Sequence, residues 1–150
     1  MSSILSVEEI IEKLNSLKKN SSPRWGEMSS SQMMKHCSSF IDLYLGKIKV
    51  PFWYKFFGTT IGKVFLLYIS KKSPLETPRN IRTEKSIKII DENLDFDYEK
   101  KLLIEKLNKL HKIKGQINHP IYGIMKSEKI LFLIKHHTIH HLNQFNLMKG

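Results

Sequence analysis

Four of the chain's seven histidines lie within residues 135–142, which read Lys-His-His-Thr-Ile-His-His-Leu. Residues four apart share one face of a helix, so this segment offers two pairs, His136 with His140 and His137 with His141. Two imidazoles one turn apart on a buried face can chelate one divalent ion. The segment therefore indicates metal binding if one of the pairs faces the protein interior.

A helical projection of residues 130–148 distinguishes the two pairs. At about 100° per residue, the centre of the apolar residues lies roughly 50° from Ile130. His137 and His141 fall within about 70° of that centre, whereas His136 and His140 lie more than about 130° from it. We therefore expect the first pair to face the core and the second pair to face water.

A third ligand from another helix would complete an open three-histidine site, and His36 is the candidate. His36 sits about 95° from the apolar centre of its own expected helix, at the margin of the buried stripe. The alternative for a lone buried histidine is a hydrogen-bonded core residue, and for His36 considered alone that interpretation is favoured. His36, His137 and His141 are thus the predicted ligands of Zn²⁺, Ni²⁺ or a similar ion, because imidazole ligation does not identify the metal. The neighbouring Cys37 is expected to be a buried core thiol.

Hydrophobic periodicity and capping signals predict four long helices. Their expected bounds are Ser6 to near Asn20, Ser29 to Gly46, Asp95 or Asp97 to Gly115, and Ser127 to Phe145. The predicted fold class is all-α.

Two echoes in the sequence suggest that the chain consists of two related helical hairpins. Glu-Lys-Leu-Asn-Ser-Leu-Lys-Lys at residues 12–19 recurs as Glu-Lys-Leu-Asn-Lys-Leu-His-Lys at residues 105–112. A Pro-x-aromatic-Gly-x-Met segment follows each copy, at residues 23–28 and 120–125. Chance similarity among common helix residues is the alternative, although two echoes in the same order weaken it. Such a repeat would place the helices carrying His36 and His137 in equivalent positions.

Residues 47–94 form a long crossover between the second and third predicted helices, with an aromatic-rich stretch at residues 52–68. A structureless connection of this length is improbable in a compact domain, so we expect it to pack against the helices. The favoured role is a structural crossover that buries Trp53, Phe56 and Phe57, and the alternative is a substrate lid.

The 150 residues suit a single domain spanning residues 1–150, and the formal net charge is +11. A basic chain attracts nucleic acid or acidic membranes, but its three arginines and scattered lysines lack the clustering typical of nucleic-acid binders. The single cysteine and the absence of a secretory signal pattern favour the cytoplasm. Lysines and glycines interrupt residues 50–69, so no transmembrane segment is expected.

Taken in order, four segments resemble a functionally uncharacterised branch of the DinB-like superfamily. They are residues 23–29 (Pro-Arg-Trp-Gly-Glu-Met-Ser), 33–37 (Met-Met-Lys-His-Cys), 119–123 (His-Pro-Ile-Tyr-Gly) and 135–145. The resemblance covers nearly the whole chain and implies a four-helix bundle with up-down-down-up topology.

The resemblance also implies a metal site built from one histidine of the second helix and a His-x-x-x-His pair of the fourth. These map onto His36, then His137 and His141. The chain departs from the pattern at Ile139, where the family often has an acidic residue. The sequence therefore does not identify the groups that orient the metal-binding histidines. Relatives include thiol-dependent transferases and proposed hydrolases, and related bundles often dimerise, which makes a homodimer one expected assembly.

The leading functional hypothesis is a metal-dependent hydrolase or thiol transferase that activates water or a low-molecular-weight thiol for a small-molecule substrate. The catalytic residues beyond the metal ligands are unknown; Glu27, His111 and His119 could assist with protons. Two alternatives stay open: a non-catalytic basic module that binds an acidic partner or membrane surface, and a bundle with a purely structural metal.

Overall fold

The computed structural model describes residues 4–81 and 85–149, which form a predominantly helical fold with one small sheet. The long helices are α1 (Val7–Asn15), α2 (Ser30–Tyr44), α5 (Phe96–Asn108) and α6 (Ser127–Gln144). Two shorter helices, α3 (Phe52–Phe57) and α4 (Lys63–Ser70), lie in the crossover, and strands β1 (Gln116–His119) and β2 (Gly123–Lys126) precede α6.

The first two helices begin where the capping signals predicted. Ser6 and Glu9 bond each other's backbone N–H groups at the start of α1, and Ser29 and Gln32 do the same before α2. Asp95 caps α5 through the N–H of Tyr98. The helix ends were predicted less accurately, because α1 stops at Asn15 rather than near Asn20 and α5 stops at Asn108 rather than at Gly115. Helix α6 begins at Ser127 as expected, but no side-chain hydrogen bond caps it.

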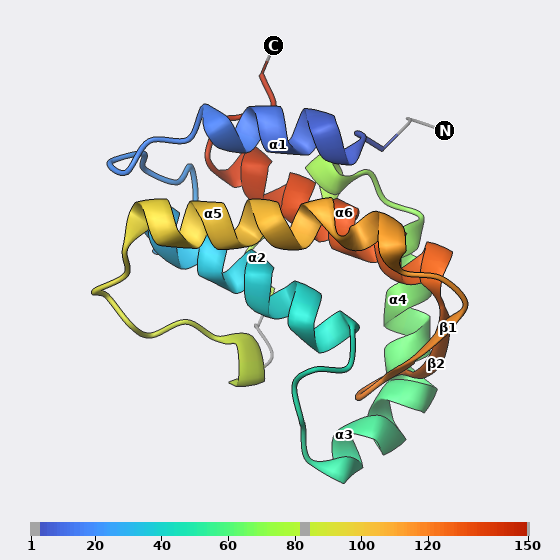
Figure 1. Cartoon of the computed structure of the whole chain (residues 1–150). Coiled ribbons are helices and arrows are strands. Elements are labelled where there is room, and N and C mark those ends of the chain that lie inside the picture. The colour runs from blue at the N-terminus through green and yellow to red at the C-terminus, as the bar shows by residue number, and fades with distance from the viewer. Residues whose placement is uncertain (1–3, 82–84, 150) are drawn as a thin grey trace.

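The four long helices pack around one core, with α1 and α2 each contacting both α5 and α6. Figure 1 shows α1 and α6 running in one direction and α2 and α5 in the other. An ion pair between Lys106 Nζ and Asp42 Oδ2, at 2.6 Å, joins α5 to α2. The centre of the core consists of fully buried apolar side chains, among them Ile10, Leu14, Met33, Met34, Leu103, Ile130, Ile134 and Leu142.

The prediction of an all-α class was wrong in one respect, because β1 and β2 form an antiparallel hairpin. The two strands pair in the register Gln116 with Lys126 and His119 with Gly123. Short strands of four residues carry little periodic signal, and the turn between them depends on a side chain: His119 Nδ1 accepts hydrogen bonds from the backbone N–H groups of Ile121 and Tyr122. The hairpin leads directly into α6.

The two echoed loops share a local backbone feature. Gly26 in the first loop and Gly123 in the second have φ values of +77° and +76°, a region that favours glycine. Only the second loop lies in a β-hairpin, because its flanking residues pair as strands.

The crossover packs against the hairpin through glycine rather than through its aromatic residues. Within residues 52–70 of the crossover the buried residues are Gly58, Leu66 and Ile69, and a Cβ at Gly58 would lie 2.2 Å from the carbonyl oxygen of Ile121. A Cβ at Gly62 would lie 2.7 Å from the Tyr122 ring. The backbone of this segment therefore lies directly on the β-turn.

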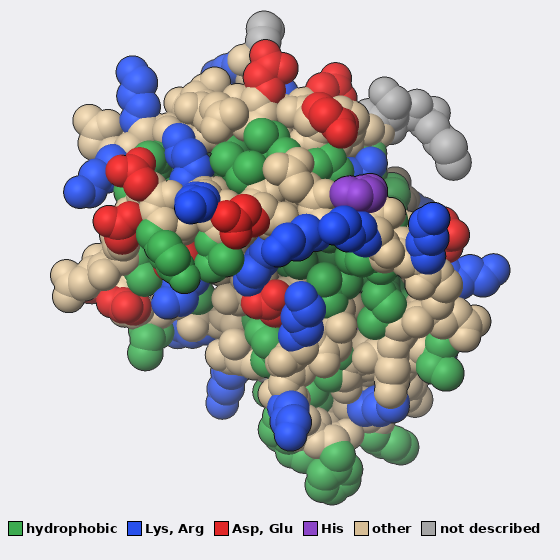
Figure 2. Space-filling model, viewed as in Figure 1, with side chains coloured by type: hydrophobic (Ala, Val, Ile, Leu, Met, Phe, Trp, Pro, Cys, Tyr) green, Lys and Arg blue, Asp and Glu red, His purple; other side chains and the backbone are tan. Residues whose placement is uncertain are grey.

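The expectation that the crossover buries Trp53, Phe56 and Phe57 was wrong, since these side chains are 50%, 69% and 53% exposed. The glycines occupy the inner face, so the bulky side chains of α3 project outward. Figure 2 shows the hydrophobic side chains gathered at the lower end of the molecule, where Figure 1 places α3. Among the described residues, no helix is both long and apolar enough to cross a membrane.

Replacing Gly58 with alanine tests this close packing, because two effects oppose each other. Helix propensity alone predicts that alanine stabilises the segment by about 1 kcal/mol. The steric contact with Ile121 predicts a loss of about 1–3 kcal/mol instead. We expect amide hydrogen exchange of residues 52–70 to be faster in Gly58→Ala than in the parent. Thr60→Ala, on the exposed side, is the control and should not accelerate exchange; slower exchange in Gly58→Ala would contradict the packing.

Candidate metal centre

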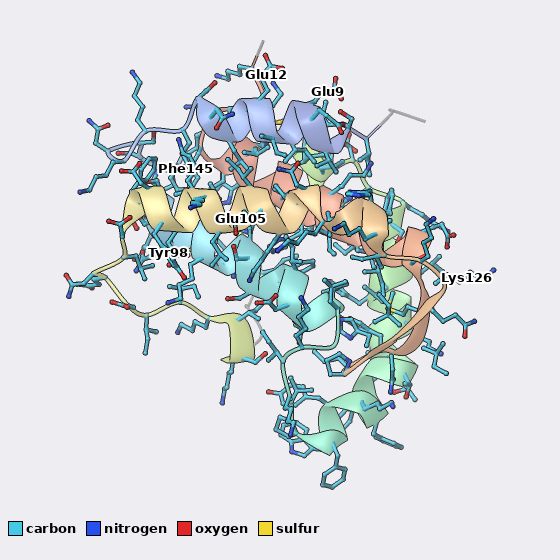
Figure 3. All side chains as sticks on the ribbon, viewed as in Figure 1. Glu9, Glu12, Tyr98, Glu105, Lys126 and Phe145 are labelled. Atoms are coloured by element: carbon cyan, nitrogen blue, oxygen red, sulfur yellow. The ribbon has the colours of Figure 1, made fainter. Side chains whose placement is uncertain are left out.

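His36 on α2 meets His137 and His141 on α6 inside the helical core. The Nε2 atom of His137 lies 3.0 Å from Nε2 of His36 and 3.2 Å from Nε2 of His141. One ligand atom from each ring lies within 4.8 Å of the other two. His36 and His141 are buried and His137 is partly buried, so the three side chains predicted from the sequence do converge. Figure 3 shows the long α6 between Lys126 and Phe145, which stand just outside its two ends.

The outer nitrogens of two of these rings have hydrogen-bond acceptors that fix their tautomers. His36 Nδ1 lies 3.2 Å from the carbonyl oxygen of Ile87, so it carries the proton that it donates to this acceptor. His141 Nδ1 lies 2.7 Å from Oε1 of Gln144. Gln144 in turn donates from Nε2 to the carbonyl oxygen of Trp25 at 2.7 Å, which orients its amide with Oε1 toward the imidazole. The Nε2 atoms of His36 and His141 therefore both present lone pairs to the centre.

The third ring, that of His137, is positioned by packing. Phe40 stacks on it, with ring centroids 3.7 Å apart and an interplanar angle of 8°. Its Nδ1 atom is buried and has no hydrogen-bond partner among the described residues. Its Nε2 atom, in contrast, has two neighbouring imidazole nitrogens and can give a proton to only one of them.

This donor set fits a divalent cation. Two nitrogens bound to one tetrahedral ion at about 2.0–2.1 Å stand roughly 3.3 Å apart, close to the 3.0 and 3.2 Å seen here. A cation would satisfy all three inward lone pairs at once, whereas hydrogen bonding alone leaves at least one unpaired. The hydrogen bonds to Ile87 and Gln144 are the outer contacts that commonly orient metal-bound histidines.

The surroundings keep these imidazoles neutral, which is the form that binds metal. Burial lowers the pKa of His36, although its hydrogen bond to Ile87 partly opposes this. Burial, followed by the nearby His141 and His36, holds the pKa of His137 well below 6.5. Burial and the proximity of His36 likewise place the pKa of His141 well below that value.

The expectation that His136 and His140 face water was wrong. His136 is buried, with Nε2 2.7 Å from the hydroxyl of Thr77, and His140 is partly buried with its ring 5.6 Å from that of Trp25. A short helical turn of the crossover, Pro74–Glu76, packs against α6 and covers this side. A helical projection of one segment cannot show that another segment, distant in the sequence, buries its polar face.

The other residues singled out from the sequence lie outside the three-histidine group. His119 is buried and holds the hairpin turn, while His111 is exposed beside the end of α5. Cys37 is fully buried against Met33, as expected for a core thiol, and burial raises its pKa. Glu27 is exposed and lines the cleft that leads to the histidines.

The three histidines line a cleft of about 1750 Å³. Its walls include Trp25 from the first echoed loop, Tyr44 from α2, and Trp53 and Tyr54 from α3. The candidate metal position is therefore reached from a cavity with aromatic walls, large enough for a small molecule.

Three contributors to the site were absent from the sequence-based prediction. Gln144 lies three residues after His141 and Phe40 four residues after His36, so helical spacing could have indicated both. The Ile87 contribution is a backbone carbonyl, which no residue type reveals. The acidic residue missing at Ile139 has no bearing on the site, because that side chain is buried in the core and Gln144 orients His141.

Comparison with known proteins yields a match to a protein family. A family model described as "Protein of unknown function (DUF1569)" matches residues 3–148, nearly the whole chain. No curated protein matches. No solved structure matches either.

Removing the Gln144 amide tests whether it orients a ligand. Loss of such an outer hydrogen bond typically lowers metal affinity about 10–100-fold. We expect Gln144→Ala to show this loss for Zn²⁺ in a competition titration with a chromophoric chelator. The matched control is Asn143→Ala, which removes the adjacent amide, bonded to Arg24 rather than to a histidine. Equal affinities of the two variants would contradict the assignment.

The buried histidines also predict how stability depends on pH in the metal-free protein. Burial lowers the pKa of both His119 and His136 to about 4, whereas the unfolded chain titrates near 6.5. Below pH 6.5 the unfolded state therefore binds more protons, and stability falls as the pH falls. Each of the two residues accounts for on the order of 2 kcal/mol between pH 6.5 and 5.

Urea unfolding in the presence of a chelator, repeated between pH 7.5 and 5, measures this slope. His119→Asn keeps an acceptor for the turn and should flatten the profile, while the exposed His111→Gln should leave it unchanged. A parent protein equally stable at both ends of this range would contradict the prediction.

Proposed function

We propose that this chain, which belongs to the DUF1569 family, is a metal-dependent enzyme whose His36, His137 and His141 hold one divalent ion. The observation that carries the proposal is the convergence of three imidazole Nε2 atoms at the wall of a large cleft. We further propose that α1, α2, α5 and α6 form a single four-helix domain of the DinB-like type. Their directions, with α2 and α5 opposite to α1 and α6, and the ligand pattern favour this.

The ligand count supports catalysis over a closed structural site. Structural zinc sites use four protein ligands, whereas catalytic sites use three and leave one position for water or substrate. Among the described residues, only these three form a group of metal-binding side chains close enough to share an ion. When bound there, a divalent ion supplies Lewis acidity and lowers the pKa of a coordinated water or thiol.

The protein's own groups would hold this centre rigid and partly dry. The carbonyl oxygen of Ile87 and the amide of Gln144 fix the orientation of two rings, and Phe40 fixes the third by stacking. The aromatic walls formed by Trp25 and Tyr44 favour a substrate with apolar surface.

The proposed reaction class is hydrolysis or transfer to a low-molecular-weight thiol. Both need a nucleophile that is deprotonated near neutral pH, which an open three-histidine site provides for water and for a soft sulfur ligand alike. Cys37 is not that nucleophile, because it is fully buried and burial raises the pKa of its thiol. A thiol would therefore enter from solution, which suits a reducing, cytoplasmic setting.

Elemental analysis of untagged protein after metal reconstitution tests the ligand set. We expect about one divalent ion per chain in the parent and well under one in His137→Ala and His141→Ala. The control is His111→Ala, an exposed histidine that should keep full occupancy. A parent that binds no metal would remove the enzyme proposal.

Cobalt substitution separates a catalytic site from a structural one. With an open coordination position, adding azide or 2-mercaptoethanol should change the visible spectrum of the Co²⁺ protein, because each can bind the ion directly. A spectrum that stays the same, together with a large fall in melting temperature on chelation, would assign the metal a structural role.

A further inference from the structure

The segment from residue 47 to residue 72, comprising α3, α4 and their flanks, carries an unusual exposed surface, called here the α3–α4 face. Large apolar side chains lie in solvent along it, including Phe52 (89% exposed), Phe56, Ile61, Val64 and Leu67. Contiguous exposed apolar surface of this kind typically marks an interaction site. The metal centre does not account for it, because these five side chains are not among those that line its cleft.

The same segment is purely basic. Between residues 43 and 75 the sequence contains six lysines and no aspartate or glutamate. All six are exposed: Lys47, Lys49, Lys55, Lys63, Lys71 and Lys72. Figure 2 shows lysine or arginine side chains beside the hydrophobic group at the lower end of the molecule.

The geometry keeps this surface facing outward. Gly58 and Gly62 lie directly on the β-turn at Ile121 and Tyr122, so the backbone of the segment cannot rotate its bulky side chains inward without a clash. The side chain of Lys129 on α6 bonds Ser70 at the end of α4 and ties that end to the body. The neighbouring hairpin adds Ile124, which is also exposed and shares a shallow hollow with Lys63 and Leu67.

We propose that the α3–α4 face docks this protein onto the surface of an anionic lipid bilayer. Segments that lie in a membrane interface insert aromatic and aliphatic side chains at the boundary with the headgroups, while surrounding lysines bind acidic lipids. The α3–α4 face has both the exposed apolar side chains and the lysines. None of the described helices is long and apolar enough to span a membrane, so in this proposal the segment lies on the bilayer surface.

Two other occupants fit the surface less well. A second copy of the chain, related by a twofold axis, would place the lysines of one face against the lysines of the other, which like-charge repulsion opposes. A nucleic acid would pair with lysines and aromatic rings, but the exposed Ile61, Val64 and Leu67 add nothing to base stacking.

Vesicle flotation of the 150-residue chain tests the proposal. It is done in the presence of a chelator, so the result does not depend on metal binding. We expect the protein to float with vesicles of phosphatidylcholine containing about one third phosphatidylglycerol, and to dissociate as salt is raised. Equal flotation with pure phosphatidylcholine, or no flotation with either, would overturn it.

Matched charge reversals locate the contact. Lys63→Glu with Lys71→Glu should weaken partitioning at least about tenfold. Lys109→Glu with Lys112→Glu makes the same change in net charge at exposed positions outside the face, and should weaken it less than about threefold. Equal losses would show that only the overall charge matters and would overturn the assignment.

The native tryptophans give a test that needs no disruptive substitution. Brominated lipid should quench Trp53 on α3, so quenching persists in Trp25→Phe and is lost in Trp53→Phe. Quenching that depends on Trp25 instead would overturn the proposal. Two further results would overturn the proposal. One is a dimer, detected by sedimentation, that dissociates in the double variant Phe56→Ser with Val64→Ser. The other is tighter binding to an oligonucleotide than to anionic vesicles.

Discussion

The close approach of three neutral imidazoles is the constraint on which the rest of this structure depends. Their inward nitrogens lie 3.0 and 3.2 Å apart, and a lone pair facing a lone pair is tolerable only with a shared proton or cation between them. The site therefore requires α2 and α6 to pack in a fixed register. Two of the three rings, those of His36 and His141, also have acceptors for their outer nitrogens, which Ile87 and Gln144 supply from the crossover and from α6.

Features that depend on a local sequence pattern, such as helix starts and the inward histidine pair, were predicted well. The capping pairs at Ser6 and Ser29 marked the starts of α1 and α2, and i, i+4 spacing with the helical projection selected His137 and His141 as an inward pair. These features are properties of single helices. The third histidine, His36, needed the repeat and the family resemblance, because its own projection left it at the edge of the buried stripe.

Most of what the sequence could not predict depends on segments that meet only in the folded chain. His136 is buried because the turn at 74–76 covers α6, and the aromatic residues of α3 are exposed because glycines take the inner face. The β-hairpin escaped detection because its strands are four residues long and its turn is held by His119. For His136 and for α3, contact with a distant segment overrides a local preference, whereas the hairpin is local and its sequence pattern is too short to detect.

The hydrogen bond from Gln144 to Trp25 couples the two halves of the chain at one point. A Cβ at Gly26 would lie 2.9 Å from Nε2 of Gln144, and the backbone there has a φ of +77°. Glycine at position 26 thus leaves room for the amide whose other end holds His141. Anyone redesigning the ligand shell must treat positions 26 and 144 as one unit, since a larger residue in the loop would displace an imidazole more than a hundred residues away along the chain.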